Sequence, residues 1–180
     1  MNNEPEKIIL NRNVKATVVP FGEEVELTQG TEVTITQSLG GTYTVVTEGK
    51  MLRISNQNAD ALGKPIIKVD DQLGSDATLE EKIWAALKTC YDPEIPINIV
   101  DLGLIYGVEI QNVTDKTFAV RIQMTLTAPG CGMGPIIAAD AKQKIFELEE
   151  VVEVDVEMVF DPPWDRSRMS DEAKLTLGIF

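Results

Sequence analysis

In the last third of the chain the apolar side chains change from alternation to helical spacing and back to alternation. In residues 118–127 large apolar side chains alternate strictly with small or polar ones, residues 137–148 repeat at helical spacing, and residues 152–160 alternate again. The glycine-rich segment 128–134 joins the first strand to the helix, and Pro135 suits a first helical turn. A strand–helix–strand unit of this length predicts two parallel strands of one sheet, joined by a right-handed crossover.

One helix and one strand are predicted upstream of this unit. Thr78 and Glu81 form a capping-box pattern that starts a helix, and residues 104–110 alternate as a strand that turns into residue 118. The side chains expected to face the core are Leu79, Ile83, Ala86, Leu87 and Cys90, then Leu104, Tyr106, Val108 and Ile110, then Phe118, Val120, Ile122, Met124 and Leu126, then Ile137, Ala141, Ile145 and Leu148, and finally Val152, Val154, Val156, Met158 and Phe160. The predicted order is α-β-β-α-β with a small mixed sheet.

The first part of the chain is predicted to form short β-strands separated by turn residues. The predicted strands are Ile8–Leu10, Val14–Val19, Val25–Leu27, Val33–Gln37, Tyr43–Thr47 and Met51–Ile54. Runs this short, rich in Val, Ile and Thr, predict a small β-barrel or sandwich. The polar segment 70–76 breaks the pattern, so we expect a small β-rich domain at 1–74 and a second domain at 75–180. The predicted fold class is α+β.

The composition excludes several kinds of site. The chain has no histidine, which removes Ser-His-Asp and Cys-His catalysis and most zinc and copper sites. Its formal net charge of −13 repels phosphate backbones and anionic lipids, so we expect neither a nucleic-acid partner nor a membrane partner. A polar, acidic start, the lack of an apolar run of about 18 residues, and only two cysteines predict a cytoplasmic protein without a disulfide framework.

Cys131 is the predicted functional thiol. It lies between a strand end and a helix start, flanked by Gly130 and Gly132, whose flexible backbone leaves the sulfur accessible. The N–H groups at the start of a helix favour an anion, so we expect them to favour the thiolate. A small buried cysteine that fills a tight turn is the alternative. Cys90 continues the apolar stripe of its helix, so we expect it to be buried and structural.

Polar residues elsewhere are predicted to converge on the same loop. A hairpin turn centred near Thr114 would place Asp101 beside Thr127, at the sheet end that carries Cys131, and the segment 92–96 would cover that end. The expected pocket consists of the Cys131 thiol with Asp92, Glu94, Asp101, Thr125, Thr127, Gly130 and Gly132. Capping of a helix or turn is the alternative for the two aspartates. We expect Trp164 to pack on the core, with partner docking as its alternative.

Three separated segments of the second domain carry a recognisable pattern. They are residues 91–106, the strand 124–127 with the following Pro129-Gly130-Cys131-Gly132-Met133-Gly134, and the ending 160–170 with its Asp-Pro-Pro-Trp sequence. Together they resemble the SufT/PaaD-type family of iron–sulfur cluster assembly proteins. The resemblance covers about residues 76–180 and is closest to SufT, whose members are similar in carrying an additional N-terminal domain.

The resemblance implies an accessory factor, not an enzyme, that helps deliver or insert iron–sulfur clusters into apo-proteins. Cys131 would be the functional cysteine and an iron or cluster ligand, and the partners would be apo-client proteins and other iron–sulfur assembly proteins. A cluster usually takes four thiolates, and one chain offers a single well-placed thiol. Three arrangements stay open: two Cys131 thiols that meet across a homodimer with exogenous ligands, a transiently held cluster, or a bond from Cys131 to iron or a partner without any cluster.

Three other functions compete with general maturation. The first, within the family, is a PaaD-like accessory subunit dedicated to one oxygenase complex. The second is a thiol-dependent redox protein, which the missing histidine and the lack of a C-x-x-C pair disfavour. The third is an adaptor in which Cys131 is inert.

Overall fold

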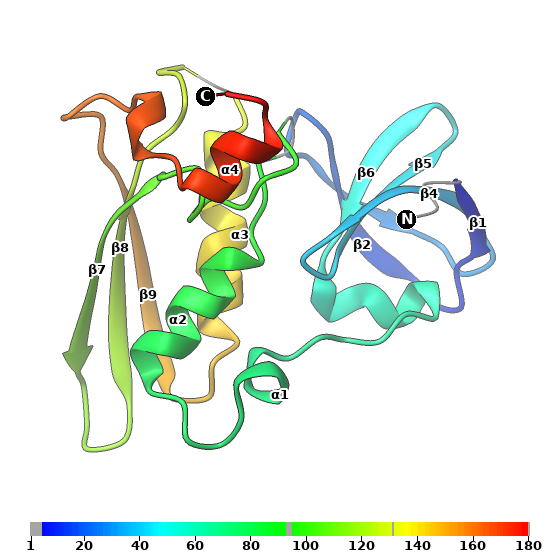
Figure 1. Ribbon diagram of the computed structural model, residues 1–180. Coiled ribbons are helices and arrows are strands. Elements are labelled where there is room, and N and C mark those ends of the chain that lie inside the picture. Colours follow the sequence, from blue (N-terminus) through cyan, green and yellow to red (C-terminus); the bar gives the residue numbers. More distant parts are fainter. Residues whose placement is uncertain (1–4, 93–94, 131, 180) are drawn as a thin grey trace. The chain divides into compact units, whose positions relative to one another are not determined.

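The computed structural model describes residues 5–92, 95–130 and 132–179 (Figure 1). It divides into two compact units, Met1–Lys68 and Val69–Phe180. The division lies a few residues before residue 74, because the short helix α1 (Val69–Leu73) contacts α2 (Leu79–Lys88). Lys82 of α2 lies 3.3 Å from Asp70 of α1, so this polar segment packs with the second unit.

The first unit is a single six-stranded antiparallel sheet in the order β1-β4-β5-β6-β2-β3. Its strands are β1 (Glu6–Ile9), β2 (Val14–Val18), β3 (Glu24–Leu27), β4 (Glu32–Leu39), β5 (Thr42–Thr47) and β6 (Lys50–Ile54). All six predicted strands are confirmed, and hydrogen bonds between neighbours join them in one sheet. The core of the unit holds Val33, Val45 and Leu52, together with Ala59 and Leu62 of the 3₁₀ helix η1 (Asn56–Leu62).

The second unit has the predicted α-β-β-α-β order. Its sheet runs β7-β8-β9, with β7 (Ile105–Asn112) antiparallel to β8 (Phe118–Met124) and β8 parallel to β9 (Val151–Met158). α2 and α3 (Gly134–Phe146) cover one face of this mixed sheet (Figure 1), and the 3₁₀ helix η2 (Arg166–Arg168) and α4 (Asp171–Thr176) follow it. In the described part of the chain, no helix has the length and apolar character needed to cross a membrane.

The core of the second unit follows the predicted periodicity with one correction. The predicted inward residues that are buried include Ile83, Ala86, Leu87 and Cys90, then Val120, Ile122, Met124 and Leu126, then Ile137, Ala141, Ile145 and Leu148. In the last predicted strand, however, Val152 and Phe160 are exposed at 46% and 48%, against the prediction. The β8–β9 register shifts between Phe118 and Ala119, so Val151 takes the buried position at the start of the strand. Phe160 lies beyond the end of β9.

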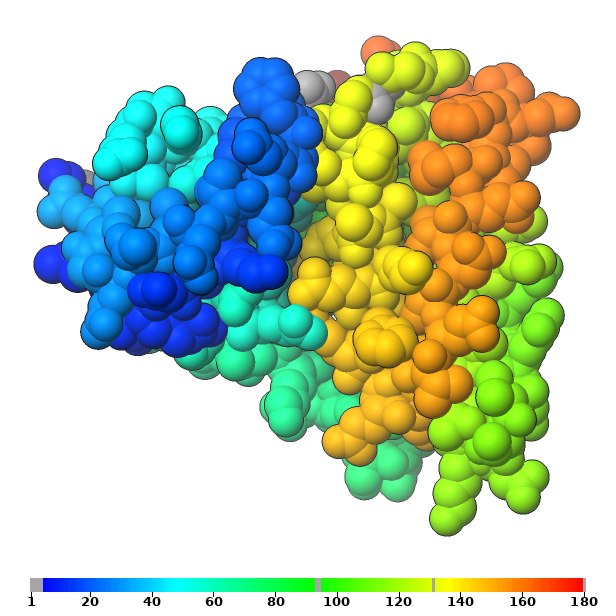
Figure 2. Space-filling model, turned by 180° about the vertical axis from the view of Figure 1, so that it is seen from behind, coloured from blue at the N-terminus to red at the C-terminus, as the bar shows by residue number. Residues whose placement is uncertain are grey.

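One face of α3 and the sheet edge formed by β9 are exposed to solvent. Figure 2 shows α3 in yellow beside β9 in orange, both reaching the solvent on this side. The exposed residues here include Phe146 at the end of α3 and Asp155 in β9, where Asp155 pairs with Arg121 at 3.4 Å. The apolar core of this unit therefore lies between the helices and one face of the sheet only.

The capping box of α2 gives a pH-dependent prediction. The Glu81 carboxylate accepts hydrogen bonds from the Thr78 N–H and hydroxyl at 2.7 and 3.0 Å, and these bonds hold the pKa of Glu81 below its ordinary value. A lowered folded-state pKa adds stability above the unfolded pKa, and this stability is lost as the pH falls through the folded pKa. Glu81→Gln should therefore destabilise the second unit at pH 7, and the difference from wild type should vanish in acid.

Urea unfolding followed by the fluorescence of Trp84, which lies on α2 itself, measures this difference at pH 7 and at about pH 3. Glu80→Gln is the matched control, because it removes the same charge from the same helical turn. A loss as large for Glu80→Gln as for Glu81→Gln would show that the helix dipole alone, and not the capping box, carries the effect.

Candidate functional site

The loop that carries Cys131 leaves the sheet at the end of β8 and enters α3. Cys131 itself lies outside the described residues. Gly130 and Gly132 on either side of it are exposed, and a Cβ built on either one would meet no atom within 4 Å. Gly130 has a φ of +83°, which is the left-handed conformation that glycine favours. The backbone is therefore open to solvent on both sides of the cysteine position.

The start of α3 is built for a close approach to β8. A Cβ on Gly134 would lie 2.7 Å from the Leu126 side chain, so glycine lets the first helical turn pack against the residues that follow the strand. Pro135 occupies the first turn as predicted, and the N-cap residue Met133 contributes no side-chain hydrogen bond to the helix. Pro135 has no N–H, and the Ile136 N–H donates to the Met133 carbonyl at 3.1 Å, so Gly134 is the residue of this first turn that presents an N–H directly after the cysteine loop.

The two threonines that precede the loop have different surroundings. Thr125 is 1% exposed, and its N–H donates to the Leu104 carbonyl at 2.8 Å, which extends the pairing beyond β8. Thr127 is half-buried and lines a cavity. The sequence placed both hydroxyls in one pocket, whereas the structure places only Thr127 on the cavity wall.

The predicted pairing of Asp101 with Thr127 is wrong. β7 begins at Ile105 and β8 ends at Met124, so the ladder does not reach either residue. The Asp101 carboxylate instead accepts a hydrogen bond from the Asn98 side chain at 2.6 Å, and the Asp101 N–H donates to the same side chain at 2.9 Å. The Asn98 side chain therefore caps this turn, and the Asp101 carboxylate holds that side chain in place.

Asp92 also acts in a local turn. It is 8% exposed, and its carboxylate accepts a hydrogen bond from the Ile95 N–H at 3.1 Å. Its N–H donates to the Ile97 carbonyl at 3.2 Å, which closes the turn from both sides. Glu94, the other acidic residue expected here, lies outside the described residues.

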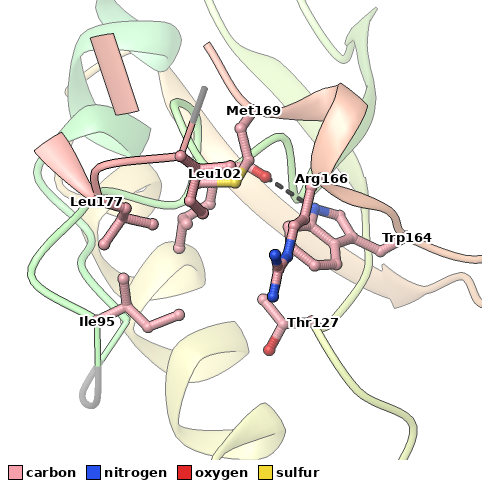
Figure 3. A pocket seen from close by; sticks show the side chains of 8 residues that line it. Ile95, Leu102, Thr127, Trp164, Arg166, Met169 and Leu177 are labelled. Atoms are coloured by element: carbon pink, nitrogen blue, oxygen red, sulfur yellow. Dashed lines mark hydrogen bonds between the residues drawn. The ribbon is translucent and has the colours of Figure 1, made fainter. Parts of the chain in front are cut away.

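A small cavity lies beside these segments. Its volume is about 210 Å³, and its walls are largely apolar. It is lined by Ile95, Leu102, Thr127, Trp164, Arg166, Met169, Leu177 and Ile179. Figure 3 shows Trp164 and Arg166 on one side of it, Ile95 and Leu177 on the other, and the Arg166 side chain pointing toward Thr127. The cavity thus joins residues from the segment 95–102, the end of β8 and the C-terminal tail.

The C-terminal tail is held against the turn at residues 101–103. The Trp164 indole N–H donates to the Leu102 carbonyl at 2.8 Å (Figure 3), and the Ser170 N–H donates to the Asp101 carbonyl at 2.8 Å. Gly103 has a φ of +72°, and a Cβ there would overlap the backbone carbonyl of Arg168. The predicted packing of Trp164 is therefore real, but its place beside Leu102 was not foreseen.

Tyr106 adds two further contacts to the tail. Its hydroxyl donates to the Pro162 carbonyl at 2.8 Å, and the Arg168 guanidinium lies 4.1 Å from the centre of its ring. Two of the three recognised segments, 91–106 and 160–170, therefore form one structure. A single sequence gives no signal for this pairing, since the partners lie about sixty residues apart and pair mostly through backbone carbonyls.

Cys90 is buried as predicted. It lies just after the end of α2 and is fully inaccessible to solvent, and its sulfur lies 3.7 Å from the Ala86 carbonyl of that helix. The adjacent Thr89 carbonyl accepts a hydrogen bond from the buried Lys144 ammonium at 2.5 Å, which ties the end of α2 to α3. Within residues 5–92, 95–130 and 132–179, no three His, Cys, Asp or Glu side chains are grouped so that they could hold a metal ion.

Comparisons with known proteins address the second unit. Residues 80–156 match the family model described as "Iron-sulfur cluster assembly protein". The Fe-S protein maturation auxiliary factor YitW of Bacillus subtilis is 43% identical over 101 residues, covering 56% of this chain and 95% of that protein. The Fe-S protein maturation auxiliary factor SufT of Staphylococcus aureus is 43% identical over 88 residues, covering 49% of this chain and 96% of that protein.

A solved structure supports the same assignment. The crystal structure of a domain of unknown function from Bacillus anthracis superimposes with a TM-score of 0.50 at 39% identity, covering 57% of this chain and 93% of that one. The family match runs from the first turn of α2 into β9, and it includes the loop that carries Cys131. Sequence identity, fold and segment order agree with the resemblance noted in the sequence, and the chain belongs to the iron–sulfur cluster assembly protein family.

Proposed function

We propose that this protein is a non-enzymatic accessory factor in the maturation of iron–sulfur proteins, and that it acts through Cys131. The observation that carries the proposal is the match to relatives named Fe-S protein maturation auxiliary factors over at least 95% of their own length. The loop that contains Cys131 lies inside the matched segment. The open surroundings of Gly130 and Gly132 support an accessible thiol there.

In this role Cys131 acts as a ligand, and the cargo that it binds is iron or an iron–sulfur cluster. A thiolate binds iron, and the positive end of the α3 dipole favours a negative charge next to the start of this helix. A single thiol cannot complete the four ligands that a cluster usually takes, so the site would hold its cargo transiently or share it with a second copy or a partner. Incomplete ligation suits a donor, because a fully ligated cluster is released slowly.

The proposed partners follow from this role. They are apo-client proteins that receive the cargo and other proteins of iron–sulfur assembly, in the cytoplasm. A homodimer would bring two Cys131 residues to one cargo. The remaining ligands would then come from exogenous groups.

The test is complementation of a deletion strain in which several iron–sulfur enzymes are assayed. Cys131→Ser should reduce all of these activities to the level of the deletion, because the hydroxyl is a poor ligand for iron. Cys90→Ala is the matched control, since Cys90 is buried in the core of the second unit just after α2, and this variant should restore activity. Protein levels are measured by immunoblot, so that loss of the thiol is separated from loss of the protein.

The other outcomes identify the competing functions. Loss of one oxygenase activity alone would indicate a dedicated accessory subunit. Full activity with Cys131→Ser, together with loss on deletion, would indicate an adaptor and would refute a role for the thiol. Anaerobic reconstitution with iron and sulfide, followed by visible absorption, then asks whether the wild-type chain holds a cluster that the Cys131→Ser chain does not.

A further inference from the structure

The cavity beside the tail contains a cation in an otherwise acidic region. Residues 75–180 carry nine basic and nineteen acidic side chains. Arg166 is the only basic residue among the eight that line the cavity, and none of the eight is acidic. Its guanidinium forms no ion pair with any residue in the described part of the chain. An anion that approaches this surface would therefore meet its favourable contact at Arg166.

The neighbouring Asp165 does not form an ion pair with Arg166. Hydrogen bonding of the Asp165 carboxylate to the Ser167 side chain, and then to the Ser167 N–H at 2.7 Å, holds the pKa of Asp165 below its ordinary value, and the N–H bond caps η2. Arg168, two residues further, is stacked on the Tyr106 ring. Each neighbouring charge thus has a structural partner, while Arg166 points into the cavity toward Thr127 (Figure 3).

The cavity combines this single cation with apolar walls. A volume of about 210 Å³ admits one side chain of the size of leucine or phenylalanine. Leu102, Met169 and the ring of Trp164 offer it apolar contacts. An occupant that fits must therefore present an apolar side chain directly beside a carboxylate.

We propose that the cavity is a docking site for a partner protein segment in which an apolar side chain stands next to an acidic one, with the apolar group between Trp164 and Leu177 and the carboxylate on Arg166. This inference deepens the proposed function and rests on it, because it assigns the chemistry by which clients or assembly partners are recognised. It does not involve the thiol, so the two proposals can fail separately. The tail would then act as the recognition element of the second unit.

The side chains that line the cavity are ordered, which favours specific binding of a partner segment. The Trp164 indole is fixed by its hydrogen bond to the Leu102 carbonyl, and Met169 is 4% exposed. A site whose anchoring groups are already ordered loses little conformational entropy on binding. Short peptides should therefore bind measurably, although weakly.

Trp164 fluorescence tests the proposal directly. The chain has two tryptophans, so Trp84→Phe leaves Trp164 as the only one, and Cys131→Ser in the same protein removes the thiol. The probes are three peptides: acetyl-Gly-Leu-Glu-Gly-amide, the same peptide with Gln for Glu, and the same peptide with Ala for Leu. The first should give a saturable fluorescence change, and each of the other two should bind about tenfold more weakly.

Two variants locate the charge. Arg166→Gln should weaken the first peptide about tenfold and leave the Gln peptide unchanged. Lys116→Gln, in the exposed hairpin between β7 and β8, makes the same charge change at the other end of the sheet and should have no effect. Equal affinity for the Glu and Gln peptides, normal binding by Arg166→Gln, or no saturable change with any peptide would overturn the docking site. None of these results would affect the cell assay of Cys131.

Discussion

Replacing Gly103 with alanine is expected to lower the free energy of unfolding of the second unit by about 3 kcal/mol or more. Two costs combine at this position. The φ of +72° is unfavourable for any residue with a Cβ, and the new methyl group would overlap the Arg168 carbonyl and lie 2.6 Å from its carbon. Because the obstacle is backbone, no rotamer change relieves it, and the tail has to move away.

The tail cannot move without losing its anchors. The two residues before Gly103 accept hydrogen bonds from Trp164 and Ser170, which lie on either side of Arg168 along the tail. Urea unfolding followed by tryptophan fluorescence measures the loss, since both tryptophans belong to the second unit.

Gly74 provides the matched control for backbone strain. It has a φ of +80°, and a Cβ there would meet no atom within 4 Å. Gly74→Ala should therefore cost only the conformational term, about 1 kcal/mol. If both alanine variants lose the same stability, the close approach of Arg168 to Gly103 is refuted.

The predictable part of the fold is the part controlled by local periodicity. The alternation at residues 118–127 and the helical spacing at residues 137–148 each describe one element packed on one core, so β8 and α3 follow directly from them. The capping box at Thr78 and Glu81 is present as expected. The failure at Val152 comes from a register shift at the start of β9, where one extra residue moves that side chain out of the core, and no composition rule marks where this happens.

The candidate site was harder to predict because its contacts are long-range and involve the backbone. The sequence extended β7 back to Asp101, but Gly103 in a left-handed conformation ends that possibility and makes residues 98–103 a turn. The same glycine lets the tail approach closely at Arg168. Gly103 therefore helps to position the tail residues that line the cavity. An isolated glycine between two leucines, Leu102 and Leu104, was the one available signal of close backbone approach.

Deleting residues 161–180 should destabilise the remainder of the second unit by about 3–5 kcal/mol. The deletion removes the buried Met169 and Ala173 from the core and leaves the Asp101 and Leu102 carbonyls without their donors from the tail. It also removes the Pro162 carbonyl that accepts from Tyr106. Trp84, the tryptophan that this variant retains, reports the unfolding transition in urea.

The decisive comparison combines the deletion with Gly103→Ala in a double-mutant cycle. In the shortened chain the Arg168 carbonyl is gone, so only the cost of the left-handed conformation remains, and Gly103→Ala should cost about as little as Gly74→Ala. The expected coupling is therefore about 2 kcal/mol, the part of the Gly103→Ala cost that depends on the tail. Additive losses would mean that Gly103 stabilises only the turn at residues 98–103. The position of the tail, and of the cavity that it lines, would then not depend on Gly103.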